Sequence, residues 1–137
     1  MVSFIKASGS NPKKDLIELW KRLVFIMAVF NTDDHRRNHG FILEKTGWRL
    51  SPLYDVNPVP EGDELALCVN KYNPTISVAL ALETAPYYGL AEKEARRTAN
   101  EMTDTVRGNW ERLVATHGLS RSAIEFMRPA FSACYGE

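Results

Sequence analysis

Hydrophobic side chains recur at helical spacing over the first quarter of the chain. Asn11 and Pro12 suit a helix opening, because asparagine caps free backbone N–H groups and proline fits the first turn. The pattern that follows predicts one helix that ends at Asn31. Its apolar face is wide, which indicates a helix set deep in the core. The residues of that face are Leu16, Leu19, Trp20, Leu23, Val24, Met27 and Phe30.

The pattern then changes to two short apolar runs around a polar turn. Residues 41–43 and 48–50 flank the turn 44–47, and Gly47 suits a position where positive φ is often required. This arrangement predicts a short β-hairpin.

Prolines and glycines divide the middle of the chain. Residues 57–63 contain two prolines and a glycine and predict a loop, and residues 65–69 have a weak strand pattern. A helix is expected over about 75–84, with Pro86 and Gly89 stopping it.

A long amphipathic pattern predicts a further helix that stops at Gly118. Ser120 can cap a last helix, which Pro129 should kink or end. We therefore expect a mainly α fold with a small β-hairpin, forming a single domain over 1–137 in which residues 1–11 are a flexible leader. The apolar positions of the long helix are Ala95, Ala99, Met102, Val106, Trp110, Leu113 and Val114.

Composition narrows the classes of function. The 137 residues, 45% of them hydrophobic, suffice for one core. Seventeen basic residues balance seventeen acidic ones, so no overall field favours direct binding to nucleic acid or membrane. Cys68 and Cys134 lie too far apart in sequence for metal-ligand spacing, and the apolar run 23–30 is too short to span a membrane. With no signal peptide evident, we expect a cytoplasmic protein with reduced thiols.

The segment after the first long helix carries the chemistry. Asp33 stands five residues before Asn38, and Asp55 follows the predicted hairpin. Phosphoryl transfer uses this order: one aspartate orients the attacking hydroxyl, while an asparagine and a later aspartate hold Mg²⁺ against the phosphates of ATP. The pattern therefore predicts a kinase catalytic loop, in which His35 braces the loop or contacts the transferred phosphoryl group.

Other chemistry fits some of the same residues. His35 and His39 are four residues apart, as in a helical zinc pair, although Asn38-His39-Gly40 is a poor helix sequence. A metal-dependent hydrolase built on Asp33, Asp34, His35 and His39 is thus one alternative. His39 as a residue at the start of a strand is another.

The paired motifs resemble the C-terminal domain of HipA-type serine/threonine kinases, the toxins of bacterial toxin–antitoxin modules. The family pattern Thr-Asp-x-His-x-x-Asn is matched by residues 32–38, and Leu-x-Pro-x-Tyr-Asp by residues 50–55. Residues 88–95 are similar to a further helix entry of that family.

The resemblance implies a kinase-like, helical C-terminal lobe that uses ATP and Mg²⁺. It makes Asp33 the catalytic base and Asn38 and Asp55 the magnesium ligands, and it places His35 in the active site without defining its role. It also implies a protein substrate, such as an aminoacyl-tRNA synthetase, and a HipB-like DNA-binding antitoxin as partner. Phosphoinositide kinases share part of the motif, so a lipid kinase is an alternative that Tyr54-Asp55 argues against.

Complete HipA-like kinases also carry an N-terminal lobe with an ATP-facing lysine and a phosphate-binding loop. Residues before Asp15 show no strand pattern, and Gly9 is an isolated glycine. We therefore expect this chain to be a catalytic-lobe fragment, inactive alone, whose missing lobe is supplied elsewhere. The alternative is a non-catalytic helical module that retains the lobe as a scaffold for binding a partner.

Overall fold

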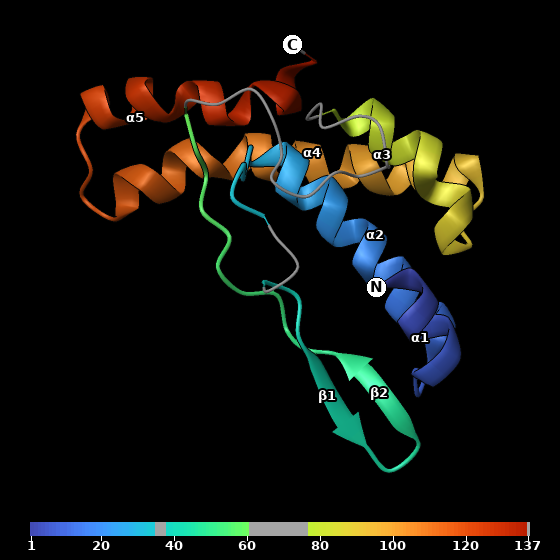
Figure 1. Cartoon of the computed structure of the whole chain (residues 1–137). Helices are drawn as coiled ribbons and strands as arrows, with labels where there is room; N and C mark the ends of the chain where they lie inside the picture. Colours follow the sequence, from blue (N-terminus) through green and yellow to red (C-terminus); the bar gives the residue numbers. More distant parts are fainter. Residues whose placement is uncertain (35–37, 61–76, 137) are drawn as a thin grey trace.

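The computed structural model describes residues 1–34, 38–60 and 77–136. Helices dominate these residues, and one two-stranded antiparallel hairpin accompanies them, so the expected fold class is confirmed. Figure 1 shows α2 (Pro12–Ala28) crossing the centre of the molecule, with α1 (Val2–Ser8) and the hairpin toward one end. The long helix α4 (Glu92–Thr116) crosses α2 near its other end.

Helix α2 begins as its sequence predicts. The side chain of Asn11 accepts a hydrogen bond of 3.2 Å from the N–H of Lys14, and Pro12 occupies the first turn. The helix ends at Ala28, three residues before the expected end at Asn31. The apolar pattern continues beyond it because Val29 is buried in a second core, but Phe30 adopts φ 49° and leaves the helical path.

The expectation of a flexible leader is wrong for residues 2–8, which form α1. Ile5 is only 1% exposed and belongs to the main core. A helix of seven residues is marginal on its own, so tertiary packing rather than local propensity accounts for it. The turn after α1 also pairs with the hairpin: Ser10 N–H donates to the carbonyl of Trp48 at 2.6 Å.

The hairpin is confirmed and has a regular register. Strand β1 (Phe41–Glu44) pairs with β2 (Gly47–Leu50), so that Phe41 lies opposite Leu50 and Glu44 opposite Gly47. Gly47 has φ 138°, a backbone conformation that residues other than glycine rarely adopt. An ion pair of 2.6 Å between Arg49 and Glu44 lies on the exposed side.

The second half of the chain is helical. It contains α3 (Val78–Thr84), the 3-10 helix η2 (Ala85–Tyr88), α4, α5 (Arg121–Met127) and the 3-10 helix η3 (Arg128–Tyr135). Positive φ at Gly89 and Gly118 ends η2 and α4, and Ser120 caps α5 through the N–H of Ala123, as expected. The strand expected over 65–69 and the start of the helix expected from 75 lie outside the described residues.

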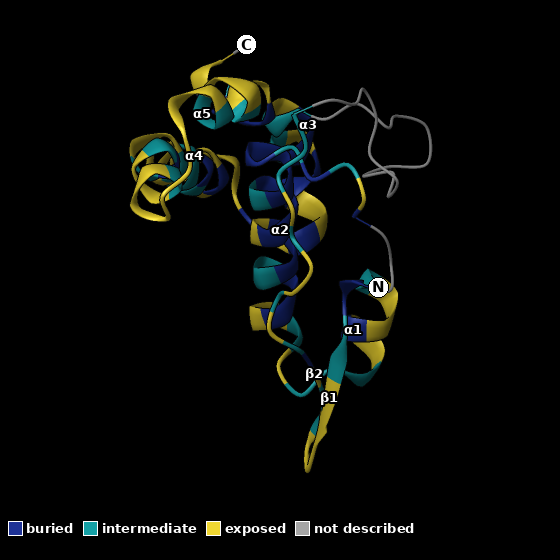
Figure 2. Cartoon of the chain, turned by 90° about the vertical axis from the view of Figure 1, so that its left-hand side faces the viewer, coloured by how far each residue is buried: buried dark blue, intermediate teal, exposed yellow. Residues whose placement is uncertain are grey.

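Two cores hold the elements together. The main core surrounds Trp20 of α2, which is fully buried and donates from its indole N–H to the carbonyl of Ala81 at 2.8 Å. Figure 2 shows the buried residues concentrated along α2. The second core joins the end of α2 to the C-terminal helices through Val29, Trp110, Ala130 and Phe131.

No helix in the described part of the chain combines the length and apolar character needed to cross a membrane.

Candidate functional site

The loop that follows α2 holds the first half of the predicted motif. Asn31 N–H still bonds to the carbonyl of Ile26, after which the chain turns and exposes Asp33. Asn38 is only 4% exposed, and its side-chain Nδ2 donates to the backbone carbonyl of Asp33 at 3.3 Å. The structure therefore links these two predicted site residues directly, and this bond leaves Oδ1 of Asn38 available as an oxygen ligand.

A second pair in the same loop is fully buried. Nε2 of His39 lies 3.0 and 3.1 Å from the two carboxylate oxygens of Asp34. Among the described residues, Nδ1 of His39 has no hydrogen-bond partner, and neither does either side-chain polar atom of Asn31. The sequence placed Asp34 in the hydrolase alternative and His39 either there or at the start of a strand, whereas in the structure the two side chains bind each other.

Asp55 lies on the segment that follows the hairpin. Its side chain is exposed, and its Oδ1 accepts a hydrogen bond of 3.1 Å from Nδ2 of Asn57. The backbone at Asp55 has φ 56°, a left-handed conformation that is uncommon for residues other than glycine. Such strained positions are concentrated at functional sites, where surrounding structure imposes them.

Two backbone hydrogen bonds hold the Asp55 segment against the loop after α2. Ser51 N–H donates to the carbonyl of Gly40 at 2.9 Å, and Val59 N–H donates to the carbonyl of Phe30 at 3.2 Å. Residues 30–40 and 51–59 are thus tied together at both ends, and Asp55 lies midway along the second segment. Within the described residues, no hydrogen bond joins the side chain of Asp55 to Asp33 or Asn38.

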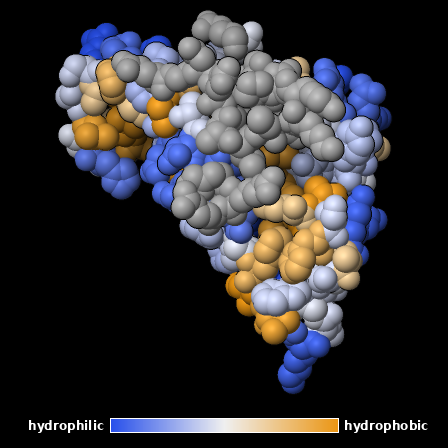
Figure 3. All heavy atoms as spheres, viewed as in Figure 1, coloured by the Kyte–Doolittle hydropathy of each residue, from blue (hydrophilic) through white to orange (hydrophobic). Residues whose placement is uncertain are grey.

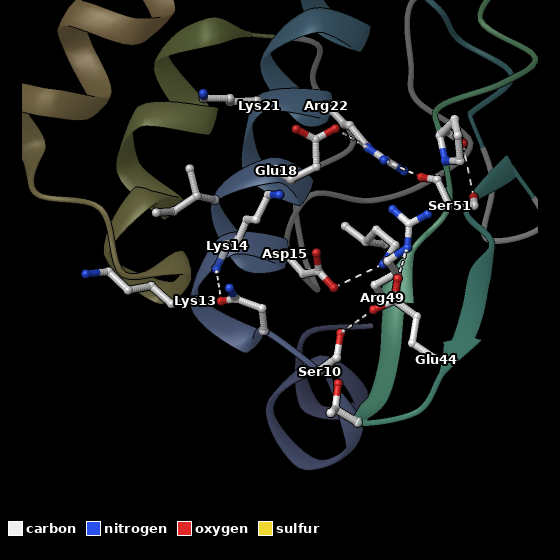
Figure 4. Close-up of a pocket in the computed structure, with 15 residues that line it drawn as sticks. Ser10, Lys13, Lys14, Asp15, Glu18, Lys21, Arg22, Glu44, Arg49 and Ser51 are labelled. Carbon is white, nitrogen blue, oxygen red and sulfur yellow. Dashed lines mark hydrogen bonds and ion pairs between the residues drawn. The ribbon is translucent and has the colours of Figure 1, made fainter.

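Buried polar side chains of α2 anchor the hairpin side of this arrangement (Figure 4). Oδ2 of Asp15 accepts the backbone N–H of Leu50 at 3.0 Å. Arg22, which is 4% exposed, donates from Nη2 to the carbonyl of Ser51 and from Nε to Glu18. The last residue of β2 and the first residue of the Asp55 segment are therefore both fixed to α2.

A cavity of about 920 Å³ lies between the first half of α2 and the hairpin. Its acidic residues make contacts within the wall, since Asp15 binds Leu50 and Glu44 binds Arg49. Asp33, Asn38 and Asp55 do not line it. Among the described residues, therefore, this cavity is separate from the predicted catalytic motif.

The donor set at the motif suits a hard divalent cation held partly by substrate. Asn38 supplies an amide oxygen and Asp55 a carboxylate, whereas no group of three His, Cys, Asp or Glu side chains in the described ranges could hold a metal. Mg²⁺ commonly binds one or two protein carboxylates and completes its shell with substrate phosphates and water. His35, the remaining predicted site residue, lies outside the described residues, as do Arg36 and Arg37.

Comparison with known proteins identifies the family. No curated protein matches the chain. The family model described as the HipA-like C-terminal domain matches residues 1–110, well over half of the chain and a span that includes both halves of the motif. The chain therefore belongs to the family of HipA-like C-terminal domains.

Proposed function

We propose that this chain is the catalytic lobe of a serine/threonine kinase that transfers the γ-phosphate of ATP to a protein hydroxyl and acts as the toxin of a toxin–antitoxin module. The family is generally kinase-related. The proposal depends on one observation: backbone hydrogen bonds join two segments at both of their ends. One segment bears Asp33 and Asn38, and the other bears the strained Asp55.

Asp33 acts as the base in this proposal. Its side chain is exposed at the end of the buried helix α2, where an incoming hydroxyl can reach it. A carboxylate in hydrogen-bond reach of the hydroxyl orients the oxygen and accepts its proton as the new bond to phosphorus forms. The backbone carbonyl of Asp33 is held by Asn38, so the base and the neighbouring ligand keep a fixed relation.

Asn38 and Asp55 would hold Mg²⁺ through one neutral and one anionic oxygen ligand. The ion, when bound, neutralises charge on the β- and γ-phosphates. The Nδ2 contact of Asn38 to Asp33 turns its Oδ1 away from that bond, and Asp55 retains Oδ2 beside its contact to Asn57. His35 is assigned to the same site by the family motif alone.

Exposed apolar side chains indicate that a partner covers the end of the molecule with α1 and the hairpin. Phe4 is 39% exposed and Leu43 is 64% exposed. Figure 3 shows hydrophobic residues gathered over this region. A HipA-like N-terminal lobe, which supplies the remaining ATP contacts, is the partner we assign to this surface. A HipB-like antitoxin and a protein substrate such as an aminoacyl-tRNA synthetase complete the proposed cytoplasmic system.

The same surface favours a second candidate function, a non-catalytic module that binds a partner protein. Contiguous apolar side chains at a surface are typical of interaction sites. This candidate predicts that antitoxin binding survives the loss of Asp33, Asn38 and Asp55 and that no phosphate is transferred under any condition.

Calorimetry and phosphotransfer assays test the kinase. We expect weak or undetectable binding of Mg²⁺–ATP to the chain alone, and a clear gain when a HipA-like N-terminal lobe is added. In that assembly Asp33→Ala should lower phosphate transfer by about 10²- to 10⁴-fold while ATP still binds. Asn38→Ala and Asp55→Ala should weaken Mg²⁺–ATP binding as well.

Asp104→Ala is the matched control, because this carboxylate lies exposed on α4, where it pairs with Arg107. Its phosphotransfer should equal that of the unmodified chain. Near-normal transfer by Asp33→Ala would refute the base assignment. Tight zinc binding, or phosphoesterase activity without ATP, would favour the hydrolase instead.

A further inference from the structure

The buried pair Asp34–His39 duplicates the spacing of the predicted site residues. Asp34 follows Asp33 and His39 follows Asn38, so two contacts link the same two dipeptides, each across five residues. One is the Asn38 side chain on the Asp33 carbonyl, and the other is the imidazole on the Asp34 carboxylate. Each of the two predicted site residues is thus the sequence neighbour of one member of the buried pair.

The geometry defines how the pair is bonded. An ionised carboxylate only accepts hydrogen bonds, so Nε2 of His39, at 3.0 and 3.1 Å from its two oxygens, carries the hydrogen. The side chains of Asp34 and His39 are 3% and 0% exposed. Separating them within the protein would leave a carboxylate buried without a partner, which is far more costly than breaking an exposed contact.

The pair links the two described sides of this loop through side chains. Between the described residues 32–34 and 38–39 there is no backbone–backbone hydrogen bond, so side chains provide the cross-links there. The Asn38 contact alone is long, at 3.3 Å, and has a neutral donor and acceptor. The Asp34–His39 contact is shorter, doubled and better shielded from water, so it is the stronger of the two cross-links.

From these contacts we infer that Asp34 and His39 are positioning residues: their buried hydrogen bonds close the loop and set the place of Asp33 relative to Asn38. The inference rests on the proposed function for its catalytic meaning, but the closure of the loop is a property of the chain itself. Neither residue touches the reacting groups in this assignment. Loss of a hydrogen-bond partner that orients a metal ligand typically lowers metal affinity by 10- to 100-fold.

The test compares variants of the full chain that separate hydrogen bonding from space filling. His39→Leu keeps apolar bulk and removes the donor, whereas His39→Gln keeps an amide N–H near the position of Nε2. Thr84→Val is the control for a buried hydrogen bond lost elsewhere, since Thr84 is 7% exposed and donates to the carbonyl of Ala81 at 2.9 Å. If His39→Leu does not fold, Asp34→Leu and Asp34→Asn form the equivalent pair.

Two measurements are made on each variant. The first is the NMR resonance and hydrogen exchange of the Asn38 side-chain amide, which reports on loop closure without any ligand. The second is Mn²⁺ affinity from water-proton relaxation, measured with ATP and the HipA-like N-terminal lobe present and with Mn²⁺ as the probe for the magnesium site. We expect His39→Leu to release the Asn38 amide and to weaken Mn²⁺ binding about tenfold. His39→Gln should restore both readouts, and Thr84→Val should change neither.

Each outcome decides the inference. An Asn38 amide unchanged in His39→Leu would overturn it, and so would equal losses in His39→Leu, His39→Gln and Thr84→Val, which would indicate a general effect on stability. If the unmodified chain and Asn38→Ala bind Mn²⁺ equally in the presence of ATP and the N-terminal lobe, the magnesium assignment of the proposed function fails. The Asn38 amide then decides alone whether Asp34 and His39 close the loop.

Discussion

Single buried polar residues determine much of the arrangement around the candidate site. Asp15 accepts the Leu50 N–H and Arg22 binds the Ser51 carbonyl, so two side chains of α2 receive the chain where it leaves the hairpin. A backbone group buried without such a partner costs about 1–3 kcal/mol. These contacts therefore favour one position of the Asp55 segment over alternatives that would leave the same groups unpaired.

Cys134 is a buried residue whose effect depends on pH. Its Sγ–H donates to the carbonyl of Ala28 at 3.2 Å, and burial raises the pKa of the thiol from 9.0 to about 11. Below pH about 9 the thiol is neutral in both the folded and unfolded chains, so its contribution to stability is complete. Between pH about 9 and about 11 only the unfolded thiol ionises, so the free energy of unfolding falls.

We therefore expect Cys134→Ala to show a shallower alkaline loss of stability than the unmodified chain. Urea denaturation at pH 7.5, 9 and 10.5 measures this difference, with Cys134→Ser as a variant of closer shape. Both variants should start from a lower stability at neutral pH and approach the unmodified chain as the pH rises. Parallel curves over this range would show that the Cys134 thiol does not ionise differently in the two states.

At the level of elements, the hairpin is held to the junction of α1 and α2 by close backbone packing. A Cβ atom at Gly47 would lie 2.8 Å from the carbonyl oxygen of Ser8 and 3.0 Å from the nitrogen of Ser10. The φ of 138° at Gly47 is also unfavourable for any side chain. Glycine at this position thus allows the turn and the contact with α1 together.

Gly47→Ala should destabilise the protein by about 1–3 kcal/mol, the usual cost of a strained backbone position. Gly108→Ala is a control of opposite sign, because a Cβ there meets nothing within 4 Å and the residue lies inside α4. That substitution should stabilise by about 0.5–1 kcal/mol. Chemical denaturation of both variants measures the difference, and equal effects at the two positions would contradict this account.

Elements with strong local signals were predictable, and those made by tertiary contacts were not. The caps at Asn11 and Ser120 act through their own side chains, so sequence is sufficient to find them. Helix α1 has no side-chain cap and depends on burial of Ile5, which nothing local indicates. The end of α2 was misplaced because Val29 and Phe30 serve the second core while continuing the apolar pattern.

The residues of the candidate site could be predicted from the sequence, but the contacts that hold them in place could not. The Asp33, Asn38 and Asp55 assignments came from spacing and family motif, and their roles stay predictions. The Asp34–His39 bond had one signal in the sequence, the same five-residue separation as Asp33 and Asn38. Spacing alone does not say which side chains turn inward, so the pair could be recognised only from its burial.

In the whole molecule, the second core supports both segments of the candidate site. Partly buried Phe30, just before the loop that carries Asp33, and Val56, just after Asp55, pack against the cluster that contains Trp110 and Phe131. The rings of Trp110 and Phe131 are stacked, with centroids 4.3 Å apart. Phe131 lies outside residues 1–110, the part of the chain that matches the family model, so residues beyond that match contribute to the surroundings of the motif.

Phe131→Ala should destabilise the protein by about 3–5 kcal/mol, because it removes a buried aromatic side chain and leaves a cavity. Phe126→Ala is the matched control: Phe126 is 61% exposed, and its loss should change stability by less than about 0.5 kcal/mol. Urea denaturation measures both. Hydrogen exchange at Val59 N–H, which bonds to Phe30, should accelerate in Phe131→Ala, and an unchanged rate would contradict the proposed support of the site.

The left-handed backbone at Asp55 affects how the residue at this position should be interpreted in related chains that lack catalytic activity. With φ 56°, the position tolerates aspartate, asparagine or glycine far better than other residues. An inactive relative would keep one of these three residues for conformational reasons, even if it no longer bound a metal. Aspartate at position 55 alone is therefore weak evidence that a related chain is an active enzyme. Aspartates at both 33 and 55 are stronger evidence, because the exposed side chain of Asp33 has no comparable structural role among the described residues.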